Sequence, residues 1–249
     1  MTVRTRRGAR VGSPGRSKRG SPARPVRGGR VTGRAAPTVL SASLRPWLGL
    51  VAVLAALVVA VLGVLYAGDG EPGVVDARIW AAVDGAGQPW RYAATATDFL
   101  GEPVGAATLI VVTVAGCLLL RCPRAAVLAV VGTGATVGTA TLLKHLVGRT
   151  IHGDDNLSYP SGHTAFLTAL ALVVALLAAG RLGLGRAAGT SLVLAAALVA
   201  GAAMGWAQVA LGAHYPTDVL GGWCTALAVV PATAWLVDRV ADADPRKHR

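Results

Sequence analysis

Residues 47–68 read WLGLVAVLAALVVAVLGVLYAG, a run of 22 residues without Asp, Glu, Lys or Arg. A helix needs roughly 20 mostly apolar residues to cross the hydrocarbon core of a bilayer, so this run is long enough to span a membrane. Further charge-free segments lie at 104–120, 125–143, 164–180, 187–211 and 219–237. Because all are continuously apolar, they indicate helices rather than the alternating strands of a barrel. The predicted fold class is an all-α polytopic membrane bundle of six transmembrane helices.

The composition agrees with this class, because 53% of the residues are hydrophobic and only 14% are charged. The formal net charge of +12 comes from the first 45 residues, which hold 12 of the 24 Lys and Arg residues and none of the 12 acidic ones. One basic arm accounts for that charge, so no nucleic-acid partner is indicated. We expect residues 1–45 to be a disordered tail, 46–237 the membrane domain and 238–249 a C-terminal tail.

Arginine is distributed asymmetrically between the loops, which predicts an orientation. Connections 121–124 and 181–186 carry arginine, whereas 69–103 has six acidic residues against two arginines. The positive-inside rule therefore predicts a multi-pass cell-membrane protein with both termini in the cytoplasm. The basic tail then either only fixes this orientation or also contacts anionic lipid. Within the acidic loop, 75–83 and 90–99 are amphipathic, which favours short helices at the membrane interface.

The motif PSGH at 160–163 runs directly into the fourth apolar segment. Ser161, Gly162 and His163 should therefore form or precede the first turn of that helix, where free backbone N–H groups attract an anion. Ser161 adds a hydroxyl donor, and His163 can supply a proton. An ordinary serine cap followed by an interfacial histidine would give the same pattern.

A second polar motif, HYPTD at 214–218, precedes the last apolar segment. A spacing of four brings His214 and Asp218 together if the turn is helical. A carboxylate that keeps one ring nitrogen protonated leaves the other with a free lone pair, as a nucleophilic or basic histidine requires. A capping Asp218 beside an interfacial histidine is equally compatible with the pattern. Lys144 and Arg149, at the outer end of the third segment, either bind an anion or extend to the interface.

Together these residues resemble the signature of the type 2 phosphatidic acid phosphatase family, which reads K-x6-R-P, then P-S-G-H, then S-R-x5-H-x3-D. The second part is complete, and the third keeps its histidine and aspartate. The resemblance covers residues 47–237. It implies a membrane lipid phosphatase that hydrolyses a phosphate monoester or pyrophosphate of an isoprenoid or glycerolipid on the extracytoplasmic face, without a metal or other cofactor.

The resemblance also implies a role for each motif residue. His214 would be the nucleophile that forms a phosphohistidine, Asp218 its orienting partner, and His163 the acid that protonates the leaving oxygen. Fixed cations and N–H groups would stabilise the developing charge. The groups expected to hold phosphate oxygens are Lys144, Ser161 and the Gly162 backbone.

The chain departs from the signature at both motif arginines, where Ile151 and Gln208 stand. We expect Arg149 to substitute in part, because it is the outside cation nearest to Lys144 in sequence and follows Gly148. Gln208 otherwise reads as an interhelical hydrogen-bonding residue. The alternative to an enzyme is a pseudoenzyme that binds a lipid phosphate or a partner protein without turnover.

Overall fold

The computed structural model describes residues 38–84 and 88–243. The described residues form the helices α1 (Arg45–Leu65), α2 (Val74–Asp84), α3 (Gln88–Asp98), α4 (Pro103–Leu119), α5 (Pro123–Val147), α6 (Gly162–Arg181), α7 (Arg186–Ala210) and α8 (Pro216–Asp242). The six predicted membrane segments correspond to α1 and α4 to α8, so the predicted all-α class is confirmed. The two amphipathic segments are also helical, as α2 and α3, while their place at a membrane interface stays a prediction.

Five of these helices are long and apolar enough to cross a membrane. The shorter α4 passes the same test only together with α3, and the two meet at an angle of 61°. Counting that bent pair as one span gives six. Apolar side chains on α1, including Leu57, Val61 and Val64, remain exposed in the bundle. Lipid chains would cover such a surface, which is too apolar for contact with water.

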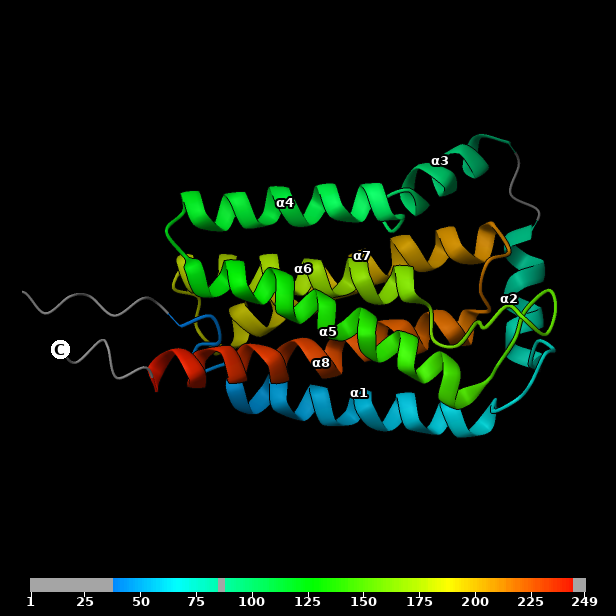
Figure 1. Cartoon of the computed structure of the whole chain (residues 1–249), viewed down its shortest axis with the longest axis horizontal. Coiled ribbons are helices and arrows are strands. Elements are labelled where there is room, and N and C mark those ends of the chain that lie inside the picture. Colours follow the sequence, from blue (N-terminus) through cyan, green and yellow to red (C-terminus); the bar gives the residue numbers. More distant parts are fainter. Residues whose placement is uncertain (1–37, 85–87, 244–249) are drawn as a thin grey trace, which may run out of the picture. The chain divides into compact units, whose positions relative to one another are not determined.

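Helix α6 lies at the centre of the bundle and packs against α5, α7 and α8, while α1 runs along α8 (Figure 1). Leu172 and Val173 of α6 belong to the same buried cluster as Leu128 of α5 and Val193 of α7. Small residues allow the close contacts. Gly201 of α7, for example, lies where any side chain would meet the indole of Trp223. Such small residues at helix contacts are typical of membrane bundles.

One end of the bundle is held by a buried carboxylate, Asp238 of α8. It accepts hydrogen bonds from the backbone N–H groups of Val39 and Leu40, both at 2.9 Å, and it pairs with Arg124 at 3.3 Å. Residues 38–44, which the sequence assigned to the basic tail, therefore pack with the bundle. Helix α8 likewise continues through Asp242, beyond the expected boundary at residue 237.

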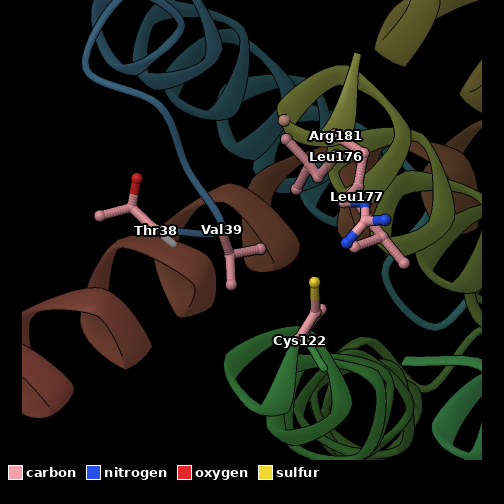
Figure 2. Close-up of a pocket in the computed structure, with 8 residues that line it drawn as sticks. Thr38, Val39, Cys122, Leu176, Leu177 and Arg181 are labelled. Atoms are coloured by element: carbon pink, nitrogen blue, oxygen red, sulfur yellow. The ribbon is translucent and has the colours of Figure 1, made fainter. Parts of the chain in front are cut away.

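Figure 2 shows the same end of the bundle, where Val39 and Cys122 face one small cavity of about 40 Å³. The side chains Leu176, Leu177 and Arg181 of α6 also border it. The cavity lies at the end where α6 finishes, whereas the polar motifs lie where α6 begins. Residues 1–37 and 244–249, the remainder of the two expected tails, lie outside the described residues.

Candidate active site

The polar motifs meet where α5 and α7 end and where α6 and α8 begin (Figure 1). Helix α6 starts at Gly162, and the Ser161 hydroxyl accepts a hydrogen bond from the N–H of Thr164 at 3.4 Å. Ser161 is thus the N-cap, which the sequence allowed as an alternative reading, and it is fully buried. Gly162 and His163 occupy the first turn and are half-buried. The first N–H groups of a helix have no partner within the helix, so this turn offers donors to an anion.

The second motif brings His214 and Asp218 together across the start of α8. The His214 Nδ1 atom lies 3.7 Å from the Asp218 Oδ2 atom. That distance is slightly longer than a hydrogen bond, and such contacts commonly tighten when substrate binds. The N-cap of α8 is Tyr215, and Asp218 lies three residues later in the first turn, so Asp218 is not itself the N-cap. Its Oδ2 nevertheless accepts the Tyr215 N–H at 3.0 Å.

His214 is only 8% exposed. Burial lowers the pKa of its imidazole below the ordinary value of 6.5, and the Asp218 carboxylate partly opposes that effect. The nearby positive groups Lys144 and His163 lower the pKa further. A neutral imidazole is the form that can attack phosphorus. Burial of His214 therefore favours its neutral form.

Lys144 stands in the last turn of α5 and is half-buried. Its Nζ donates a 2.6 Å hydrogen bond to the carbonyl of Leu157. The segment after α5 begins with Gly148, whose φ of 66° lies in the left-handed region that glycine adopts readily. The same segment closes on itself through the bridge between Thr150 and Leu157. The lysine is thereby kept at the same end of the bundle as both histidines.

Arg149 reaches the site, but its contacts differ from those of an exposed phosphate ligand. The residue is fully buried. One terminal nitrogen donates to Asp218 Oδ1 at 2.7 Å and to Thr217 Oγ1 at 2.6 Å, and the other donates to Asp76 Oδ2 at 2.8 Å. Within the described residues only Nε of this guanidinium lacks a hydrogen-bond partner. The binding of phosphate oxygens by Arg149 thus stays a prediction, and the contacts indicate a different role.

Asp76 of α2 is the main residue that the sequence analysis did not identify. Its carboxylate is fully buried, and it accepts hydrogen bonds from Thr217 N–H and Thr217 Oγ1, both at 2.9 Å, in addition to Arg149. Charged residues are rarely buried without a partner. The one sequence feature that could have identified Asp76 is its place as an acidic residue between Val75 and Ala77 in an amphipathic segment. Its partners, 73 and 141 residues away, cannot be identified from the sequence.

His163 lies beside two carboxylates from the α3–α4 bend. Its Nε2 is 3.7 Å from Asp98 Oδ1 and 3.6 Å from Glu102 Oε1. Gly101 permits this approach, because a side chain there would collide with the imidazole ring. The Gln208 amide donates to Asp98 Oδ1 at 2.5 Å, so Gln208 does bond across helices as predicted. No sequence motif connects either carboxylate with His163.

Asp98, Glu102 and His163 are also the group of residues in the described chain that could hold a metal ion, with ligand atoms within 4.8 Å of one another. Imidazole and carboxylate ligands suit several divalent metals. The same carboxylates suit a protonated histidine equally well.

The two positions where the family signature has arginine are both buried. Ile151 and Gln208, which stand there, are each 1% exposed.

The fold and the site together define an all-helical membrane bundle. At one end it carries two histidines, a lysine and a helix N-terminus. The chain belongs to the PAP2 superfamily, whose sequence model matches residues 106–242. Its fold is similar to the crystal structure of the first transmembrane PAP2-type phosphatidylglycerolphosphate phosphatase from Bacillus subtilis, with a TM-score of 0.60. The two chains are 24% identical, and the match covers 78% of this chain and 98% of the other. No curated protein matches significantly.

Proposed function

We propose that this chain is a metal-independent membrane phosphatase that hydrolyses a phosphate monoester or pyrophosphate of a lipid. Membership of the PAP2 superfamily supports a phosphatase. The observation that carries the proposal is the approach of His214 Nδ1 to the buried Asp218 carboxylate, at 3.7 Å, beside the N-terminus of α6. A histidine oriented in this way presents Nε2 as a nucleophile.

The proposed reaction has two steps. Neutral His214 attacks phosphorus through Nε2, and the bond from phosphorus to the leaving oxygen breaks as protonated His163 donates its proton to that oxygen. A water then attacks the phosphohistidine and gives a proton to His163, which releases inorganic phosphate and restores both histidines. The Lys144 ammonium, the Ser161 hydroxyl and the first N–H groups of α6 stabilise the charge on the phosphoryl oxygens.

The proposed substrate class is an isoprenoid or glycerolipid phosphate. The similar Bacillus subtilis protein is named as a phosphatidylglycerolphosphate phosphatase, and this name supports a glycerolipid phosphate. The helices around the site have exposed apolar side chains, which supports a substrate that stays in the lipid. The arginines of connections 121–124 and 181–186 support a cytoplasmic location for the opposite end, and therefore a site on the extracytoplasmic face of the cell membrane.

The second candidate function is a protein that binds a lipid phosphate or a partner protein without hydrolysis. It is favoured by one observation: the buried Ile151 and Gln208 occupy the two arginine positions of the motif. One preorganised donor to developing charge is worth roughly 2.7 to 4 kcal/mol. Two such losses without compensation would slow the reaction by several orders of magnitude.

Phosphate release by the purified full chain in detergent tests these alternatives. The panel contains phosphatidylglycerol phosphate, phosphatidic acid and a long-chain isoprenyl pyrophosphate. We expect wild type to release phosphate from at least one of them, His214→Ala to abolish release, and the exposed His145→Ala to leave it unchanged. Acid-labile ³²P labelling should appear in wild type and His145→Ala only. Saturable lipid-phosphate binding without release would instead establish the binding protein.

A further inference from the structure

We infer that Arg149 and Asp76 form a positioning pair that holds the Asp218 carboxylate in the orientation required by His214. The inference rests on the proposed function, because that function makes Asp218 the partner of the nucleophile. It assigns Arg149 a place behind Asp218, on the side away from the histidine, rather than against the phosphate. It also brings α2, which carries none of the signature motifs, into the catalytic machinery.

The two oxygens of Asp218 have separate partners. Oδ1 accepts from Arg149 at 2.7 Å, whereas Oδ2 accepts the Tyr215 N–H at 3.0 Å and faces His214 Nδ1 at 3.7 Å. A rotation of the carboxylate would break both hydrogen bonds at once. The guanidinium therefore fixes which oxygen the imidazole meets. A charge-assisted hydrogen bond of this kind is stronger and more directional than a neutral one.

Arg149 is itself held by two aromatic rings in addition to its ion pairs. The guanidinium carbon lies 4.1 Å from the ring centre of Tyr66 and 4.4 Å from that of Tyr215. Stacking of this planar group on aromatic faces adds to its ion pairs. Asp76 fixes the remaining terminal nitrogen at 2.8 Å and also accepts the Thr217 N–H at 2.9 Å. Asp76 thus anchors both Arg149 and the first turn of α8.

The charge of this cluster also suits the reaction. One guanidinium and two carboxylates, all fully buried, leave one net negative charge when each is ionised. The imidazole of His214 gains positive charge as its bond to phosphorus forms, and the residual negative charge compensates it. Asp76→Asn leaves a neutral cluster, whereas Arg149→Gln leaves two negative charges. The two substitutions should therefore change the proton affinity of His214 in opposite directions.

Other charged groups near His214 are the same in both variants. Outside the cluster they are Lys144 from α5 and His163 from α6, and His163 in turn faces Asp98 and Glu102. A shift of opposite sign between the two variants therefore reports the charge of the cluster and no other group. General loosening of the fold would not produce it.

The test uses purified full-length variants with two readouts, the pH dependence of kcat and the titration of ¹³C-labelled His214 by NMR. We expect Asp76→Asn to lower kcat by on the order of 10- to 100-fold, as outer-shell substitutions commonly do, with KM unchanged. The titration midpoint of His214 should fall in Asp76→Asn and rise in Arg149→Gln. Arg149→Lys, which keeps the charge, should recover part of the kcat lost in Arg149→Gln.

The matched control is Asp238→Asn, because Asp238 is an equally buried carboxylate that pairs with Arg124 at the opposite end of the bundle. It should lower the melting temperature and leave both the kcat and the midpoint of His214 unchanged. Midpoint shifts of the same sign in Asp76→Asn and Arg149→Gln, or no shift in either, would overturn the inference. Absence of turnover in wild type would instead reject the proposed function, while the NMR titration would still test whether the charge of the cluster acts on His214.

Discussion

The backbone N–H of Ser161 donates a 2.9 Å hydrogen bond to the carbonyl oxygen of Asp218. This bond joins the first turn of α6 to the first turn of α8, so the two motifs are fixed to each other through the main chain. Gly222, one turn further along α8, lies against the same stretch of backbone. A change that moves one helix start must therefore move the other.

Gly222→Ala should damage both stability and activity. A Cβ atom at this position would collide with the Ser161 carbonyl oxygen, which is backbone and cannot rotate away. We expect a loss of roughly 1 to 3 kcal/mol of stability, the usual cost of overpacking, together with a lower kcat. Gly138→Ala on α5 is the control, because nothing lies within 4 Å of its added methyl group. Equal melting temperatures and equal phosphate release for the two variants would contradict the packing argument.

In the pH profile of kcat, the midpoint of the acid limb should lie below the ordinary pKa of histidine. Burial lowers the pKa of His214, so the neutral, attacking form persists to a pH under about 6.5. The reaction needs a neutral His214 and a proton on the general acid, which gives a bell-shaped profile whose limbs belong to the coupled pair of histidines. Asp218→Asn removes the group that opposes the shift, so it should move the acid limb lower still. A flat kcat from about pH 5 to 8 would reject the assignment of the two histidines.

Chelation should leave turnover intact. The proposed electrophiles are Lys144, His163 and the N–H groups of α6, none of which needs a metal. We expect phosphate release after EDTA treatment to equal that of untreated protein. Loss of release, followed by recovery with Mg²⁺, Mn²⁺ or Zn²⁺, would point to Asp98 and Glu102 as ligands. Glu102→Gln would then remove the recovery, whereas it should have little effect on a metal-free reaction.

Gln208→Arg restores a guanidinium at one motif position and should raise turnover and tighten inhibition by inorganic phosphate. Asp98 already accepts a hydrogen bond from Gln208, so it would also attract the new charge. The gain should therefore be larger in Gln208→Arg combined with Asp98→Asn. Ile151→Arg should be destabilising, because that side chain is 1% exposed and a charge there would be buried. No gain in either Gln208→Arg variant would count against a phosphate-binding role for position 208.

The orientation of the chain in the membrane can be measured by labelling single cysteines introduced at Gly153, Gly212 and Gly183. The native Cys117, Cys122 and Cys224 are buried and should react slowly. We expect a membrane-impermeant maleimide to label the first two introduced positions in intact cells, and Gly183→Cys only after lysis. Labelling of Gly183→Cys in intact cells would reverse the proposed orientation and place the site on the cytoplasmic face.

The sequence by itself determined the features that depend on neighbouring residues. Apolar runs of membrane length fixed the helices, because a bilayer demands continuous hydrophobic surface and internal backbone hydrogen bonding. Ser161 before Gly162 marked the start of α6, since a hydroxyl there satisfies a free N–H. The spacing of four brought His214 and Asp218 together at the start of α8, where His214 directly precedes the N-cap Tyr215 and Asp218 lies in the first turn.

Only the tertiary structure decided which distant groups meet at the site. Asp76 pairs with Arg149 across 73 residues, and Asp98 reaches His163 through the bend between α3 and α4. Such ion pairs cannot be recognised from sequence periodicity, because each partner is a single charged residue. Whether two such residues meet depends on how whole helices pack. The same packing gives Arg149 buried partners that its place beside Lys144 in the sequence does not indicate. Burial between two tyrosines and two carboxylates, rather than proximity in sequence, determines what that guanidinium can bind.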